Sequence, residues 1–146
     1  MLDYDKSIYD TNLIVELRHP QAQLPHKANI SDACFDLYLP EDAVWAPRET
    51  RAVDLGLAIQ LEEGWEAQIR GRSGLAKRGF FVHPGTIDHL YRKNLWLIAH
   101  NLTDEPFVFK AGDRIAQVKI SRVWHVRLCP GFVDSSERGG LGSTGR

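Results

Sequence analysis

Short apolar or alternating segments recur along the chain between turns rich in Pro, Gly, Asn and Asp, and helical periodicity is almost absent. This pattern is typical of an all-β protein. The predicted strands are residues 12–17, 35–39, 50–55, 57–61, 65–70, 94–100, 106–109 and 114–126. Eight or so short strands favour a jelly-roll-like sandwich in which neighbouring strands pair through tight turns.

Two turns and one short helix complete the predicted elements. Residues 62–64 and 110–113 each contain a Gly that can adopt positive φ. Residues 73–77 are the one segment that fits a helix, with Ser73 as its candidate N-cap and Gly79 placed to end it.

The end of the chain changes character at residue 135. Residues 135–146 hold four Gly, three Ser and one Thr, and Leu141 is their single large apolar side chain. Such a segment buries too little surface to offset the entropy of ordering it. We therefore expect a single β domain over residues 1–134 and a flexible C-terminal arm over residues 135–146.

Composition restricts the partners of this domain. The 146 residues carry 18 Lys and Arg against 19 Asp and Glu, so the formal net charge is −1. Without a global basic field, nucleic acid is not an expected partner. The apolar fraction of 43% is sufficient for a packed core.

The sequence also favours a cytoplasmic location. No apolar run approaches the ~20 residues that span a bilayer, and residues 1–17 are acidic where a signal peptide would be basic, so neither membrane insertion nor export is expected. Cys34 and Cys129 form no CxxC pair, which suits free thiols in a reducing compartment.

Five segments place small residues beside charged or polar ones at strand ends or turns. They are residues 33–37 (Ala-Cys-Phe-Asp-Leu), 71–76 (Gly-Arg-Ser-Gly-Leu-Ala), 85–92 (Gly-Thr-Ile-Asp-His-Leu-Tyr-Arg), 112–117 (Gly-Asp-Arg-Ile-Ala-Gln) and 138–145 (Arg-Gly-Gly-Leu-Gly-Ser-Thr-Gly). The last of these is not a phosphate-binding P-loop, because it lacks the Lys and the chain ends without a following helix.

The second segment has the donors of an anion site. Arg72 offers a guanidinium fork, and Ser73 and Gly74 offer a hydroxyl and free N–H groups at a helix start, all suited to phosphate oxygens. The alternative is that Arg72 forms a structural ion pair and Ser73 only caps the helix.

The third segment combines a turn-forming Gly85, the carboxylate of Asp88 and the ring of Tyr91. An Asp can accept a proton from a water that attacks phosphorus, and a ring against a sugar can exclude a 2′-hydroxyl. Alternatively, Asp88 is a turn residue and Tyr91 a core aromatic. His83 and His89 flank the segment, but no third metal ligand lies at a usual spacing.

In this order and at these intervals, the five segments resemble the five motifs of the trimeric all-β dUTPases, which hydrolyse dUTP to dUMP and pyrophosphate. The resemblance covers about residues 24–146. It implies a homotrimer whose active sites are shared among subunits, dUTP as substrate and Mg²⁺ as cofactor.

The resemblance also assigns residues. It implies that Asp88 is the general base and that Tyr91 packs on deoxyribose. The other implied substrate-binding residues are Gly85 and Ile87 in the hairpin that reads uracil, Arg72, Ser73, Gly74 and Gln117 near the phosphates, and Arg138, Leu141, Gly142 and Ser143 in an arm that folds over the nucleotide. Asp36 is implied to lie near Mg²⁺ and to reach it only through water.

The sequence departs from the family pattern at several positions. Gly71 replaces a Pro, Leu141 replaces an aromatic that stacks on uracil, and the arm is about two residues shorter. Lys93 and Trp96 stand where small residues are usual.

Two other functions fit the same fold. A dCTP deaminase needs a Glu three residues before Asn101, where this chain has Ile98, and an aliphatic side chain cannot move protons. A catalytically silent nucleotide-binding trimer with a regulatory function is the other alternative.

Overall fold

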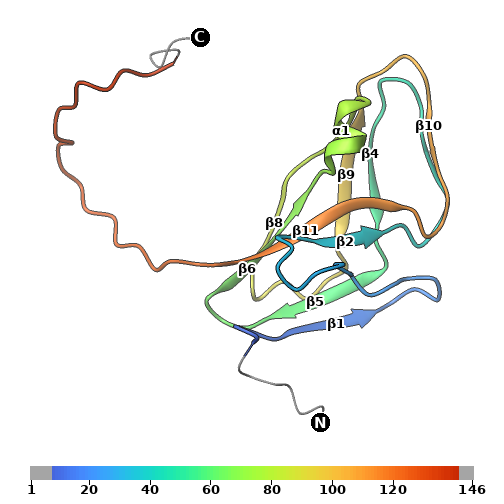
Figure 1. The fold of residues 1–146 in the computed structure, drawn as a ribbon, viewed down its shortest axis with the longest axis horizontal. Helices are drawn as coiled ribbons and strands as arrows, with labels where there is room; N and C mark the ends of the chain where they lie inside the picture. The colour runs from blue at the N-terminus through green and yellow to red at the C-terminus, as the bar shows by residue number, and fades with distance from the viewer. Residues whose placement is uncertain (1–7, 142–146) are drawn as a thin grey trace.

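The computed structural model describes residues 8–141, which contain eleven strands and one helix (Figure 1). The elements are β1 (Leu13–Leu17), β2 (Phe35–Tyr38), β3 (Ala43–Trp45), β4 (Thr50–Asp54), β5 (Leu57–Leu61), β6 (Trp65–Arg70), α1 (Ser73–Lys77), β7 (Phe80–Val82), β8 (Gly85–Ile87), β9 (Trp96–Asn101), β10 (Phe107–Phe109) and β11 (Arg114–Arg122). Within these residues, no helix has the length and apolar character needed to cross a membrane.

All strand pairs are antiparallel. The largest sheet has the order β2-β11-β6-β8, a second has the order β4-β9-β7, and two-stranded ladders join β1 to β5 and β3 to β10. Both larger sheets send buried side chains into one continuous core, so the fold is the expected jelly-roll-like sandwich.

Aromatic side chains fill the centre of that core. Trp45 is fully buried, and its ring meets Phe80 and Phe109 edge to face at centroid distances of 5.0 and 5.6 Å. Its indole N–H donates to the carbonyl oxygen of Ala99 at 3.1 Å, which satisfies the one polar group of the side chain. The sheets that position the site are therefore joined by packed aromatic rings, and the indole N–H of Trp45 is hydrogen-bonded within this core.

The predicted elements agree with the structure over most of the domain. Seven of the eight predicted strands begin and end within two residues of the observed ones, and the helix covers the predicted residues. Gly64 and Gly112 adopt φ values of 90° and 88° in the two predicted turns.

Three strands, β3, β7 and β8, were not expected, and β8 changes the interpretation of one residue. Gly85 is not in a turn, because it is the first residue of β8 and pairs with Ile69 of β6. A Cβ at this position would lie 3.6 Å from the Ile69 Cβ, an ordinary contact, so the backbone here runs as a regular strand.

The last strand ends earlier than predicted. β11 stops at Arg122 rather than at residue 126, since its partner β6 begins at Trp65 opposite Arg122. Val123 still donates its N–H to Gly64, and residues 124–141 then leave the body as a long segment without helix or strand (Figure 1). Of the predicted arm, residues 142–146, which include Gly142 and Ser143, lie outside the described residues.

Candidate active site

A small pocket lies beside β8 and the turn that follows it. This hairpin pocket has a volume of about 250 Å³ and is lined by Ile69, Gly85, Thr86, Ile87, Asp88, Tyr91, Leu95 and Trp96. Its floor is apolar, because Ile69, Ile87 and Leu95 are all buried. The polar groups of Asp88 and Tyr91 therefore stand on an apolar base, which is the usual composition of a ligand pocket.

The turn after β8 fixes Asp88 and Tyr91 relative to each other. The Tyr91 N–H donates to the Asp88 carbonyl oxygen at 3.0 Å, and the Tyr91 hydroxyl donates to the Asn94 carbonyl oxygen at 2.7 Å. Tyr91 is 37% exposed, so it is a surface ring at the pocket and not a core aromatic. The alternative in which Tyr91 belongs to the core is wrong.

A second group of predicted residues gathers where β6 ends. The Arg72 guanidinium donates to the Arg114 carbonyl oxygen at 3.1 Å and lies 3.7 Å from the Asp36 carboxylate. The same carboxylate is 3.4 Å from the Arg114 guanidinium. Two arginines therefore share one carboxylate, so this group of three side chains has a net positive charge.

Gln117 ties this cluster to the sheet. It lies opposite Asp36 on one side and opposite Arg70 on the other, and its side-chain amide donates to the Gly71 carbonyl oxygen at 2.8 Å. This bond fixes the backbone directly before Arg72. We call Asp36, Arg72, Arg114 and Gln117 the arginine cluster.

Ser73 does not cap the helix as expected. Arg72 is the N-cap residue, with extended backbone angles of −97° and 137°, and no side chain bonds to the first turn. Ser73 is already helical, so its hydroxyl is not in the N-cap position. Ser73 and Gly74 are exposed directly after Arg72 and remain available to a ligand.

The arginine cluster and the hairpin pocket lie on different parts of the same sheet, with Asp36 at the edge opposite β8 and Arg72 just beyond the end of β6. β2 carries Asp36 at one edge and β8 forms the other, with β11 and β6 between them. Three strand spacings correspond to roughly 14 Å. Asp88 is also displaced along the strands, because it follows Ile87, which pairs near the start of β6, whereas Gln117 pairs with Arg70 at its end. One chain does not bring the two groups together.

Arg138 and Leu141, the predicted arm residues that the structure describes, contact neither group (Figure 1). Both residues are exposed in the segment that leaves the body, and the Arg138 N–H donates to the nearby Ser136 hydroxyl.

The sequence predicted no site function for Arg114 or Trp96. The signal for Arg114 was its position in the fourth segment, and Trp96 could have been suspected as a large aromatic at a position that is usually small.

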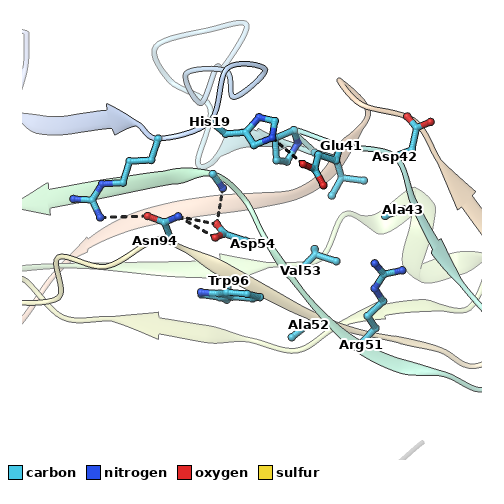
Figure 2. A pocket seen from close by; sticks show the side chains of 14 residues that line it. His19, Glu41, Asp42, Ala43, Arg51, Ala52, Val53, Asp54, Asn94 and Trp96 are labelled. Atoms are coloured by element: carbon cyan, nitrogen blue, oxygen red, sulfur yellow. Dashed lines mark hydrogen bonds and ion pairs between the residues drawn. The ribbon is translucent and has the colours of Figure 1, made fainter.

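A larger pocket of about 340 Å³ lies on the other side of Trp96 (Figure 2). Its polar groups are bonded to one another: His19 pairs with Glu41 at 2.9 Å, and Asn94 donates to both carboxylate oxygens of Asp54. At its rim, the Ala111 N–H and then Lys110 hold the pKa of the Asp42 carboxyl below its usual value. None of the residues predicted to bind substrate lines this pocket.

This antiparallel β sandwich therefore combines donors suited to an anion with a pocket that has an apolar floor. The family model described as dUTPase matches residues 20–145. The chain belongs to the dUTPase family.

Individual relatives agree with this assignment. The deoxyuridine 5'-triphosphate nucleotidohydrolase of Wolinella succinogenes is 45% identical over 134 residues, which cover 88% of this chain and 90% of that protein. The protein of the same name from Solibacter usitatus is 40% identical over 139 residues, covering 90% and 95%. Among solved structures, a mutant dUTPase of Staphylococcus bacteriophage 80alpha with dUpNHpp has a TM-score of 0.83 at 25% identity, covering 92% of this chain and 98% of the phage chain.

Proposed function

We propose that the chain hydrolyses dUTP to dUMP and pyrophosphate, by attack of water on the α-phosphorus in sites shared between three subunits. The observation that carries this proposal is the hairpin pocket, which places a carboxylate and a tyrosine ring on an apolar floor of nucleoside size. Its volume of about 250 Å³ lies below the about 300 to 1,000 Å³ of pockets for drug-sized ligands, and in this proposal it holds the nucleoside while the phosphates lie outside.

Asp88 is the general base in this scheme. Its carboxylate is exposed at the pocket rim, where it accepts a proton from the attacking water and holds that water in line with the bond that breaks. Tyr91, fixed through its hydroxyl to Asn94, packs its ring on deoxyribose and leaves no space for a ribose 2′-hydroxyl.

Uracil is read by the backbone of β8. This strand pairs with β6 on one side only, so the backbone groups on its open side have no strand partner. Unpaired N–H and C=O groups at a sheet edge offer the donors and acceptors that the uracil edge requires. The Ile87 side chain supplies part of the apolar floor.

The phosphates bind at the arginine cluster. Arg72, the hydroxyl and N–H of Ser73 and the N–H of Gly74 are donors on the surface, and the Gln117 amide lies beside them. Their charge and dipoles stabilise the negative charge that moves onto the pyrophosphate leaving group. Arg138 on the γ-phosphate, with Leu141, Gly142 and Ser143 around the nucleotide, completes the site when the arm closes.

Asp36 fits a Mg²⁺ ion that arrives with the substrate. Two guanidinium groups already neutralise its carboxylate, and residues 8–141 contain no group of three metal-ligating side chains that could form a cage. Mg²⁺ needs few protein ligands and keeps much of its water shell, so Asp36 would hold the ion through water. When bound to the triphosphate, the ion neutralises phosphate charge.

The separation of the two groups within one sheet supports a shared site. A general base must reach the attacking water within hydrogen-bond distance, whereas Asp36 is three strands, or roughly 14 Å, from β8, and Asp88 follows Ile87, which pairs with Ala67 and not with the end of β6 that leads to Arg72. In a homotrimer, the hairpin pocket of one subunit would lie against the arginine cluster of the next.

The free cysteines Cys34 and Cys129 suit a cytoplasmic enzyme.

The two alternatives are less well supported. Asn101, which would serve a deaminase site, is buried and uses its amide to bind backbone oxygens of Trp45, Ala46 and Glu105. Ile98 beside it has no ionisable group. A catalytically silent trimer would have no need of the Asp88 carboxylate at the pocket rim.

The test is the purified protein with Mg²⁺ and dUTP, dCTP, dTTP or UTP, with pyrophosphate and ammonia followed separately. Pyrophosphate from dUTP alone, lost on chelation of Mg²⁺, is the expected result. Ammonia from dCTP would establish deamination instead, and no product from any nucleotide would favour the silent trimer. The mass in solution is expected near three times 16.6 kDa.

A further inference from the structure

Trp96 lies at the boundary of the hairpin pocket. It is the first residue of β9, opposite Asp54 of β4, and it lines this pocket together with Tyr91 and Asp88. Its neighbours Leu95 and Leu97 point into the core, whereas Trp96 is 53% exposed. Figure 2 shows the ring beside Asp54, on the outer side of the strand.

The Trp96 indole differs from the other tryptophans of the folded body in having no partner. Trp45 meets two phenylalanine rings and donates its N–H, and Trp65 carries the Arg122 guanidinium over its ring at 4.9 Å. Within residues 8–141, no aromatic ring or cation lies over Trp96, and its N–H makes no hydrogen bond. Its ring face and its donor are both free for a ligand.

The backbone just before Trp96 is anchored by hydrogen bonds. Asn94, two residues before it, accepts from the Arg18 guanidinium at 3.2 Å and donates to both carboxylate oxygens of Asp54. The Asn94 carbonyl also holds the Tyr91 hydroxyl. The same short segment therefore anchors the Tyr91 ring and the start of the strand that carries Trp96, and an ordered backbone reduces the entropy lost when a ligand binds.

We propose that Trp96 is a further substrate-binding residue that contacts the base of the nucleotide, with its ring against the flat face of uracil. This inference rests on the proposed function and adds a residue to it. A flat, weakly polar base matches an exposed indole above an apolar floor, while Tyr91 occupies the sugar side of the same pocket.

The experiment compares the wild type with Trp96→Leu and Trp96→Phe, and uses Trp124→Leu as a matched control, since Trp124 is an exposed tryptophan at 77% that lines none of the pockets described above. For Trp96→Leu, we expect the dUTP KM and the inhibition constant of dUMP to rise by about tenfold to hundredfold. The kcat should change less than threefold, and inhibition by pyrophosphate, which has no base, should not change. Trp96→Phe should retain most of the binding.

Fluorescence gives an independent readout. dUMP should quench the tryptophan emission of the wild type and of Trp124→Leu, but not that of Trp96→Leu. An unchanged dUMP inhibition constant, or equal losses for dUMP and pyrophosphate, would overturn the inference. Because the wild type is assayed in parallel, failure of the proposed function appears separately, as absence of dUTP turnover. Thermal melting of each variant identifies any loss of the fold. If Trp96→Leu does not fold, the inhibition constants of Trp96→Phe are compared with those of the wild type instead.

Discussion

The side-chain amide of Asn94 donates to both carboxylate oxygens of Asp54, at 3.1 and 2.9 Å (Figure 2). Asn94 lies just before β9 and Asp54 ends β4, so this contact joins the segment that carries Tyr91 and Trp96 to the three-stranded sheet. Hydrogen bonds to a charged acceptor that is partly shielded from water are among the stronger ones in proteins.

Asn94→Ala is expected to lower the free energy of unfolding by about 2 kcal/mol, because it removes two of the three hydrogen bonds that the Asp54 carboxylate accepts. Urea denaturation at one fixed subunit concentration measures this. The control is Asn12→Ala, whose exposed contact with Glu62 should contribute less than about 1 kcal/mol. Equal losses of unfolding free energy in the two variants would mean that the Asn94 contact stabilises the fold no more than an exposed hydrogen bond does.

Asp88→Asn should reduce kcat by about 10²- to 10⁴-fold, with dUTP binding nearly intact, since the amide keeps the shape of the side chain but cannot accept the proton. Steady-state kinetics and direct binding of dUpNHpp separate the two effects. Asp104→Asn, an exposed residue paired with Arg48, is the control and should leave kcat unchanged. Normal turnover in Asp88→Asn would refute the general-base assignment.

Two substitutions at Tyr91 separate its ring from its hydroxyl. Tyr91→Phe removes the bond to the Asn94 carbonyl but keeps the ring, so the preference for dUTP over UTP should persist. Tyr91→Ala should lower kcat/KM for dUTP and narrow that preference, because the space for a 2′-hydroxyl opens. The ratio of kcat/KM for the two substrates is the measurement, and a constant ratio in Tyr91→Ala would place the discrimination elsewhere.

Deleting residues from Ser136 onward should leave the melting temperature and the mass in solution almost unchanged while most of kcat is lost. The described part of this segment makes no contact with the sheets, so its removal takes nothing from the core, but the γ-phosphate loses Arg138 and water enters the site. Full activity of the truncated protein would make the segment a terminus without catalytic function.

The sequence predicts strands well where alternation is long enough to recognise. β3, β7 and β8 have three residues each, and in so short a segment neither alternation nor an apolar run is informative. The opposite error at the end of β11 has a related cause. Val123, Trp124 and Val126 continue the apolar pattern, but β6 offers no residue beyond Trp65 to pair with them.

The site shows the same limit. Short motifs indicated the chemistry of Arg72, Asp88 and Gln117 because those residue types are tied to particular reactions. The distance between β2 and β8 depends on strand order, which no motif encodes. The unpaired state of the Trp96 indole likewise depends on which side chains the fold brings to it.

The separation of the arginine cluster from the hairpin pocket within one sheet has a genetic consequence in the proposed trimer. Arg72→Ala subunits and Asp88→Asn subunits would each form inactive homotrimers, yet damage different halves of a shared site. When the two are mixed by unfolding and refolding together, about one site in four receives an intact half from each parent. Two inactivating mutations would then complement each other in the mixed trimers. Two mutations within an active site formed by a single subunit cannot do so.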